Sequence, residues 1–276
     1  MDIAVLMSVY KSEKDIYLDR ALKSIWSDQT LRPQEIILVE DGPLTPNLYR
    51  VIENWKSILG KNLIIIKNET NIGLTKSLNK GIRATNRQFI ARMDSDDISH
   101  PDRFKKQIEY LLAHPDISVL GGSIQEFNDE NECISIRNYP SSHKDVLKYI
   151  YKASPLAHPA VMLRRSIFDG NLHYNEEYRT SQDIALWFDV ICKGYHIANI
   201  NDIVLYFRRD DDIFKRRGKE KARNEFKIYM SGIRRVYGLF TWRYIFPIMR
   251  YLFRLIPTPL LKSIYGSKLR KLILNR

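Results

Sequence analysis

The chain has 276 residues, of which 44% are hydrophobic and 11% aromatic, and it carries a formal net charge of +12. This length and hydrophobic content suffice for one sizeable core, or one domain with an appendage, and they exclude a wholly disordered chain. The two cysteines, Cys133 and Cys192, lie far apart without CxxC or Cys/His spacing, which argues against a disulfide framework and a structural zinc site.

The first residues, Met1-Asp2, lead directly into a short strand-like run instead of a charged and then apolar leader. No stretch of the sequence reaches the roughly 18 apolar residues that a membrane-spanning helix needs. We therefore expect neither secretion nor a transmembrane anchor.

The first half of the chain alternates strand and helix signals. Short apolar runs typical of strands buried on both faces occupy residues 3–9, 35–40, 63–67 and 89–93. Between them, apolar residues share one helical face in three places: Leu18, Leu22, Ile25 and Trp26, then Leu48, Ile52 and Trp55, then Leu78 and Ile82. This alternation predicts a parallel sheet with helical crossovers.

Polar side chains follow several of these strands. Tyr10 comes after the first, Asp41 after the second, and Asp94 and Asp96 after the fourth. Ligands of parallel α/β sheets bind beyond the carboxyl ends of the strands. The sequence therefore predicts one binding site at this edge of the sheet.

The segment "ARMDSDD" places three carboxylates, Asp94, Asp96 and Asp97, within four positions. Their repulsion requires a positive partner, and carboxylates on a tight turn are suited to Mg²⁺ or Mn²⁺. The first strand is followed by "YKSEKD", without the glycines of a dinucleotide or P-loop motif, and the spacing after Asp96 does not fit a calcium loop. An acidic cap on the next helix would explain one or two of the aspartates but not all three.

Four motifs, "MSVYKSE", "LVEDGP", "NETNIGLTKSLNKGI" and "ARMDSDD", resemble in order and spacing the nucleotide-binding half of family-2 inverting glycosyltransferases. The resemblance covers about residues 3–210. It implies an α/β fold of the GT-A class, with a Rossmann-like, mostly parallel sheet and helices on both faces. It also implies a nucleotide-diphospho-sugar donor and Mn²⁺ or Mg²⁺ as cofactor.

On this basis residues 1–212 are expected to form the catalytic domain. Its nucleotide-sugar half would be 1–97 and its acceptor half 98–212. Residues 213–276 are expected to form a basic, amphipathic helical region.

The resemblance also implies roles for individual residues. Tyr10 corresponds to the aromatic beside the nucleobase, Asp41 to the carboxylate that accepts from its ring N–H, and Lys76 to a residue near the nucleotide. Asp94 and Ser95 correspond to donor-binding positions, and Asp96 to the metal ligand. Because uracil has an imide N–H where cytosine has an acceptor, Asp41 favours a UDP-sugar over a CMP-sugar. Glu40 stands where the family often has aspartate, and we leave it out of the site.

An inverting displacement needs a base opposite the departing diphosphate. The segment "YRTSQDIALWFDVICKGY" resembles the part of the family that carries this base, and Asp183 matches its position. The common Glu-Asp pair reads Gln182-Asp183 here. The alternative is that Asp183 only caps a helix beginning at Ile184.

Three further residues are candidates for the acceptor side: His158, Arg208 and Arg209. His158 lies in a segment that neighbours the acceptor in the family, although a lone histidine is more often a packing residue. The stretch 206–221 also carries Lys215, Arg216 and Arg217. It is interpreted either as a lid over the diphosphate or as a solvated loop.

The charge is concentrated at the C-terminal end. Residues 226–276 contain 11 Lys/Arg and no Asp or Glu. Arg243, Arg250 and Arg254 recur at near-helical spacing among aromatic residues, which is typical of a helix in a membrane interface. A basic helix packed on the main domain is the alternative, and no motif supports a nucleic-acid partner. We expect a cytoplasmic protein held peripherally on the inner face of the membrane.

The expected activity is transfer of one hexose, galactose or glucose, from a UDP-sugar to a polyprenyl-diphosphate-linked saccharide of the GlcNAc or GalNAc type. Such a step belongs to the bacterial assembly of a surface polysaccharide such as O antigen. Two alternatives remain open. A sugar nucleotidyltransferase would want a glycine-rich loop after the first strand, and a non-catalytic carbohydrate-binding protein could retain the same fold.

Overall fold

A computed structural model describes residues 2–128, 132–209 and 219–255. The chain divides into two compact units, Met1–Arg209 and Asp210–Arg276. The domain boundary predicted at residue 212 lies outside the described residues, and the division of the catalytic domain into two halves stays a prediction.

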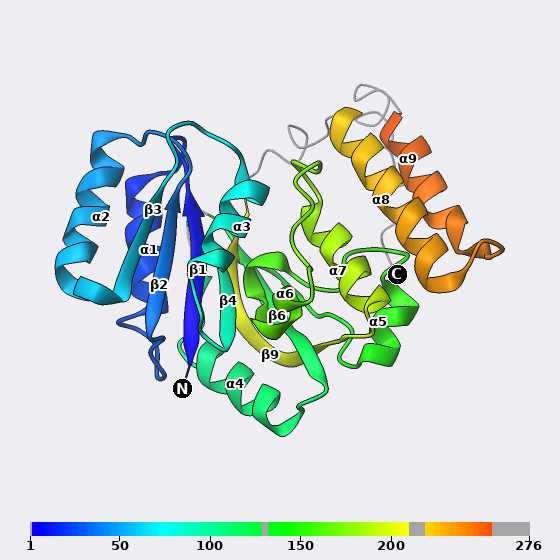
Figure 1. The fold of residues 1–276 in the computed structure, drawn as a ribbon, viewed down its shortest axis with the longest axis horizontal. Coiled ribbons are helices and arrows are strands. Elements are labelled where there is room, and N and C mark those ends of the chain that lie inside the picture. Colours follow the sequence, from blue (N-terminus) through cyan, green and yellow to red (C-terminus); the bar gives the residue numbers. More distant parts are fainter. Residues whose placement is uncertain (1, 129–131, 210–218, 256–276) are drawn as a thin grey trace. The chain divides into compact units, whose positions relative to one another are not determined.

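The first unit alternates strands and helices along the chain (Figure 1). Its strands are β1 (Ile3–Val9), β2 (Glu35–Glu40), β3 (Leu63–Lys67), β4 (Phe89–Asp94), β5 (Ile98–Ser99), β6 (Ile117–Phe127), β7 (Cys133–Arg137), β8 (Met162–Arg164) and β9 (His196–Arg208). Its helices are α1 (Asp15–Ile25), α2 (Pro46–Leu59), α3 (Leu74–Arg83), α4 (Arg103–Ala113), α5 (His143–Tyr149), α6 (Ser166–Asp169) and α7 (Gln182–Cys192), with short 3-10 turns η1 (Gly60–Asn62) and η2 (His158–Ala160).

These strands form one sheet in the order β3-β2-β1-β4-β8-β6-β9-β5, and β7 pairs with β6. The pairs β1–β2, β1–β4, β2–β3 and β6–β9 are parallel, whereas β8 runs antiparallel between β4 and β6. The four strands predicted from apolar runs are confirmed, and so is the mostly parallel sheet.

Helices cover both faces of the sheet, as predicted. On one face, Ile3, Val5 and Met7 of β1 join a core cluster that includes residues of α1, α2 and α4. On the other face, α3 packs on β1 and β2 so closely that a Cβ at Gly81 would lie 2.1 Å from Leu6 Cδ1. Strands buried on both faces explain the continuous apolar runs of the sequence.

Local signals define the ends of α2. The Thr45 hydroxyl accepts from the backbone N–H of Leu48, and Pro46 occupies the first turn, where its missing N–H costs nothing. The helix ends at Gly60, whose positive φ of 55° suits glycine.

In the second unit, α8 (Lys219–Tyr237) packs against α9 (Ile245–Leu255), and the turn η3 (Trp242–Tyr244) precedes α9. The rings of Phe226 and Tyr251 lie 4.9 Å apart between the two helices. Among the described residues, no helix is both long and apolar enough to cross a bilayer.

Candidate active site

The register of the parallel strands brings the predicted polar positions to one edge. Val9 is paired with Glu40, Glu40 with Lys67, and Ser8 with Asp94. The backbone N–H of Asp41 donates to the carbonyl oxygen of Val9 at 2.8 Å. The carboxyl ends of β1, β2 and β4 therefore meet, as the alternation of strands and helices predicted.

Three carboxylates crowd the turn after β4. Asp94, Asp96 and Asp97 each offer an oxygen, and these oxygens lie within 4.8 Å of one another. Burial, together with the charges of Asp94 and Glu13, raises the pKa of Asp96 to about 7. Burial and the neighbouring aspartates also raise the pKa of Asp97 well above its usual value. The turn therefore has a strong electrostatic demand for positive charge.

Part of that charge comes from buried arginines. Arg92 of β4 is 3% exposed, and its Nη2 donates to Asp94 Oδ1 at 2.5 Å. Arg103 is fully buried in α4, and its charge acts favourably on Asp97. Arg92 lies inside an apolar run, which predicts a strand and no more. The sequence signal for the role of Arg92 is a charged residue within a strand that is otherwise apolar and buried.

Arg208, the last residue of β9, also contacts the acidic turn. Its Nε donates to the carbonyl oxygen of Asp96 at 3.0 Å, and its backbone N–H donates to Asp97 Oδ1 at 2.8 Å. Its guanidinium also lies 3.8 Å from the centre of the Tyr17 ring. Arg208 is 5% exposed and acts as a clamp on the turn through these contacts, and its expected role on the acceptor side stays a prediction.

The residues of the turn fit a divalent cation. Asp97 Oδ2 is buried and has no hydrogen-bond partner among the described residues, so the turn retains an unused oxygen beside Asp94 and Asp96. A set of hard carboxylate oxygens suits Mg²⁺ or Mn²⁺. The sequence-based expectation of a metal at this turn is therefore chemically consistent with the side chains present.

Glu13 is a neighbour of the turn that sequence analysis missed. Its Oε2 accepts from the Ser95 hydroxyl at 2.5 Å, and its charge contributes to the raised pKa of Asp96. The residue belongs to the segment after β1, between Tyr10 and α1. Its distance from Ser95 in the sequence, 82 positions, explains why local patterns gave no sign of this contact.

Asp41 organises the loop that enters α3. Its Oδ1 accepts from the backbone N–H of Ile72 at 2.8 Å and from Asn68 Nδ2 at 3.2 Å, and its Oδ2 accepts from the N–H of Gly73 at 3.0 Å. A carboxylate offers about four acceptor positions, so one is left beyond these three bonds. Asp41 is thus a structural residue whatever else it binds.

The other two predicted nucleotide contacts are accessible at the same edge. Tyr10 follows β1 directly and is 47% exposed, and Lys76 is exposed in the first turn of α3. Glu40, which the sequence analysis left out, is buried at the end of β2, and this burial raises its pKa. Its nearest cation is Lys67, at 4.0 Å.

The helix that carries Asp183 begins earlier than the capping alternative assumed. α7 starts at Gln182, so Asp183 lies within its first turn and does not cap a helix starting at Ile184. Ser181, the residue before the helix, has a φ of 62° and a ψ of 21°, which costs energy for a residue other than glycine. A negative side chain in the first turn still interacts favourably with the helix dipole.

Tyr174, which precedes α7 in the chain, is buried. Burial raises the pKa of the Tyr174 hydroxyl, and the charges of Asp183 and Asp94 act in the same direction. That hydroxyl is 2.8 Å from His158 Nε2, and burial holds the pKa of His158 well below its usual range. His158 is therefore a neutral, buried partner of Tyr174, and a contact with acceptor stays a prediction.

Helix α3 fastens the segment that leads to α7. Asn79 Nδ2 donates to the carbonyl oxygen of Tyr174 at 2.8 Å, and Asn79 Oδ1 accepts from its N–H at 3.0 Å. Thr75 donates to the carbonyl oxygen of Tyr178 at 2.7 Å. These bonds join α3, which carries Lys76, to the segment before Asp183.

Arg209, the third acceptor-side candidate, pairs with Glu126 of β6 at 3.3 Å. Three further basic residues of the expected lid, Lys215, Arg216 and Arg217, lie outside the described residues. Neither observation tests a role in closing the site.

Comparisons with known proteins agree with this geometry. The model of the family Glycosyl transferase family 2 matches residues 4–171. The UDP-Gal:alpha-D-GlcNAc-diphosphoundecaprenol beta-1,3-galactosyltransferase of Escherichia coli is 31% identical over 271 residues, which are 98% of this chain and 97% of the relative. The amylovoran biosynthesis glycosyltransferase AmsE of Erwinia amylovora is 31% identical over 264 residues, 95% of this chain and 97% of the relative.

Among solved structures, S. aureus TarS 1-349 in complex with UDP-GlcNAc superposes with a TM-score of 0.68 at 20% identity, covering 99% of this chain and 78% of that one. This likeness shows the fold, which is the GT-A fold. With the family match and the relatives, it establishes that the chain belongs to glycosyl transferase family 2.

Proposed function

We propose that this glycosyltransferase inverts the anomeric centre of a hexose, galactose or glucose, as it moves the sugar from a UDP-sugar to a polyprenyl-diphosphate-linked saccharide of the GlcNAc or GalNAc type. The carrying observation is the acidic turn after β4, where Asp94, Asp96 and Asp97 each offer an oxygen and these oxygens lie within 4.8 Å of one another. The names of the E. coli and E. amylovora relatives support a step in surface polysaccharide or O-antigen assembly.

In this proposal the uridine lies at the edge formed by β1 and β2. The exposed Tyr10 ring stacks on the base, and the remaining acceptor position of Asp41 receives the imide N–H of uracil. Lys76 approaches the nucleotide from α3. Asp94 and Ser95 contact the ribose and the sugar, and the bond from Ser95 to Glu13 holds that turn in place.

Asp96 is the proposed metal ligand, with Asp94 and Asp97 beside it. A divalent cation bound there, Mn²⁺ or Mg²⁺, would neutralise charge on the diphosphate as it departs. The buried Arg92 limits the repulsion among the carboxylates and fixes Asp94 through its ion pair.

The proposed role of Asp183 is to accept the proton of the acceptor hydroxyl. The hydroxyl oxygen forms a bond to the anomeric carbon while the bond from that carbon to the diphosphate oxygen breaks, and UDP leaves with the bonding electron pair. Attack from the face opposite the diphosphate inverts the centre.

The lipid-linked acceptor requires a membrane surface. We propose that the enzyme works peripherally on the inner, anionic face of the cytoplasmic membrane, with the basic C-terminal region as its point of attachment. Residues 226–276 support this placement, because their Lys and Arg side chains are attracted to an anionic leaflet and they contain no Asp or Glu that the leaflet would repel.

The test is UDP release from a panel of UDP-sugars, with a synthetic lipid-diphosphate-GlcNAc or lipid-diphosphate-GalNAc acceptor and Mn²⁺, repeated with EDTA. Release that depends on the acceptor, occurs with one donor and stops in EDTA is the expected result. UDP binding by calorimetry without release from any donor would contradict the proposed transfer.

Asp183→Asn is expected to fold and to bind UDP, but to lower the transfer rate by about 10²- to 10⁴-fold, the usual contribution of a general base. Asp189→Asn is the matched control, because Asp189 is also a partly buried aspartate of α7. A rate for Asp183→Asn near that of the control would remove Asp183 from the mechanism.

A further inference from the structure

Helix α9 presents an apolar stripe to solvent. Ile245, Ile248, Met249 and Leu252 recur at helical spacing and are 55%, 39%, 59% and 53% exposed. Trp242 in η3, just before the helix, is 63% exposed. Single exposed apolar residues need no explanation, but a continuous stripe of this kind marks an interaction surface.

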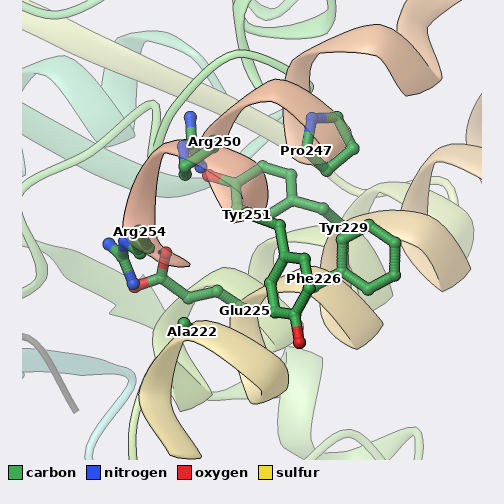
Figure 2. A pocket seen from close by; sticks show the side chains of 8 residues that line it. All are labelled: Ala222, Glu225, Phe226, Tyr229, Pro247, Arg250, Tyr251 and Arg254. Carbon is green, nitrogen blue, oxygen red and sulfur yellow. Dashed lines mark ion pairs between the residues drawn. The ribbon is translucent and has the colours of Figure 1, made fainter. Parts of the chain in front are cut away.

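The arginines of the same segment point the other way, toward α8. Arg250 lies 4.6 Å from the centre of the Tyr229 ring, and Arg254 pairs with Glu225 at 2.9 Å. Figure 2 shows Arg254 beside Glu225, and both arginines line a cleft of about 10 Å³ between the helices, which is room for roughly one water molecule. The cleft is too small for a ligand, so these residues serve the packing of the two helices.

Arg243 behaves in the same way. Its guanidinium lies 4.4 Å from the centre of the Tyr237 ring of α8 and donates to the Thr241 hydroxyl. The three arginines that the sequence suggested as lipid contacts are thus engaged within the unit. The side chains turned outward along α9 are the apolar ones.

We propose that the stripe of Trp242, Ile245, Ile248, Met249 and Leu252 inserts into the interfacial region of an anionic lipid bilayer. This inference deepens the proposed membrane partnership and rests on it for its biological setting. Apolar side chains would enter the boundary between headgroups and acyl chains, and the Trp242 indole would lie at headgroup depth.

Charge favours a bilayer over a second copy of the chain. No acidic residue follows Glu225, and Lys227, Arg234 and Arg235 are exposed on α8. Two copies meeting through this unit would bring together two surfaces with an excess of basic residues, which electrostatic repulsion opposes. An anionic leaflet would be attracted by the same residues and would also accept the apolar stripe.

The experiment measures binding of the full chain to vesicles of phosphatidylcholine with and without phosphatidylglycerol, in the absence of substrates. The stripe variant is Ile248→Gln/Leu252→Gln, since glutamine preserves helix propensity. The matched control is Ile16→Gln/Ile58→Gln, whose residues are helical and 68% and 62% exposed in the first unit. We expect the stripe variant to lose about 30-fold in vesicle partition, and the control to match the wild type.

Insertion is read directly by quenching of tryptophan fluorescence with brominated lipid. The wild type should be quenched, Trp242→Phe should lose most of the quenching, and Trp26→Phe should retain it. Vesicle binding by the stripe variant equal to wild type, or binding without quenching of Trp242, would overturn the proposal. A wild-type dimer that the stripe variant turns into a monomer, with no vesicle binding by either, would identify a second copy as the partner and also overturn it.

UDP release separates this inference from the proposed function. Vesicle binding that fails while a UDP-sugar is turned over on a water-soluble acceptor overturns the docking surface and the proposed membrane attachment, but not the proposed transfer. Vesicle binding that holds while no donor is turned over overturns only the proposed transfer.

Discussion

Asp96 is expected to destabilise the metal-free fold when it ionises. Its pKa is about 7 in the folded protein, because of burial first and of the charges of Asp94 and Glu13 next, against an ordinary value of 3.8. The difference of about 3 pKa units corresponds to about 4 kcal/mol. A carboxyl whose pKa is raised on folding binds its proton more tightly in the folded state, so stability is highest at low pH and falls as pH rises toward 7.

Asp96→Asn removes this ionisation and should therefore stabilise the chain at alkaline pH. In EDTA, we expect the difference in unfolding free energy between the variant and the wild type to grow by about 3 kcal/mol from pH 5 to pH 8.5 in favour of the variant. We compare the two proteins at each pH because His158 changes the free energy of unfolding with pH in the direction opposite to Asp96. Its lowered pKa makes the fold less stable as pH falls below the ordinary value of 6.5, and it does so in both proteins.

The assay is urea unfolding followed by circular dichroism at the two pH values, first in EDTA and then with Mn²⁺. Added Mn²⁺ should stabilise the wild type by mass action and leave Asp96→Asn nearly unchanged, which narrows the gap at pH 8.5. A gap that stays constant from pH 5 to pH 8.5 would refute the buried, repelled state of Asp96. If Mn²⁺ raised the free energy of unfolding equally in the wild type and in Asp96→Asn, the role of Asp96 as a metal ligand would be refuted.

Three further substitutions test other parts of the site. Arg208→Met removes a bond to the Asp96 carbonyl and the stacking on Tyr17, so we expect a loss of about 2–3 kcal/mol in urea unfolding; an unchanged midpoint would contradict the clamp. Gly81→Val places a Cβ against Leu6 and should cost about 1–3 kcal/mol or more, lowering the melting temperature, whereas Gly170→Ala, where a Cβ meets only contacts at 3.4 Å and beyond, should not. Asp41→Asn weakens the acceptor for Ile72 and Gly73, and calorimetry should show weaker UDP binding together with a stability loss of about 1–2 kcal/mol. UDP affinity equal to wild type would confine Asp41 to holding the loop.

Periodicity and residue type predicted the nucleotide side of the fold well. The strand bounds 3–9, 35–40 and 63–67 agree with β1, β2 and β3, because a strand buried on both faces must be apolar along its whole length. The meeting of Asp41 and Asp94 at one edge also followed, since parallel strands end on the same side of a sheet. The local sequence predicts strand bounds because burial on both faces acts on each residue of the strand itself.

α7 begins two residues before the helix start that the capping alternative for Asp183 assumed. Apolar periodicity begins at Ile184, but the helical backbone begins at Gln182 after a left-handed Ser181. Helix ends depend on backbone conformation and tertiary contacts, which the apolar pattern does not report.

The sequence by itself determined that a crowded acidic turn follows a buried strand and that such a turn needs positive charge. Only the tertiary structure decided which groups of the protein supply it, because Arg92 and Arg208 contact the turn from two different elements and the charge of Arg103 acts on Asp97 from a third. It likewise decided that the arginines of α9 face α8 while the apolar stripe faces solvent. Residue spacing defines the faces of a helix, but which face meets a neighbour depends on packing with another element, and that packing is settled only when the whole unit folds.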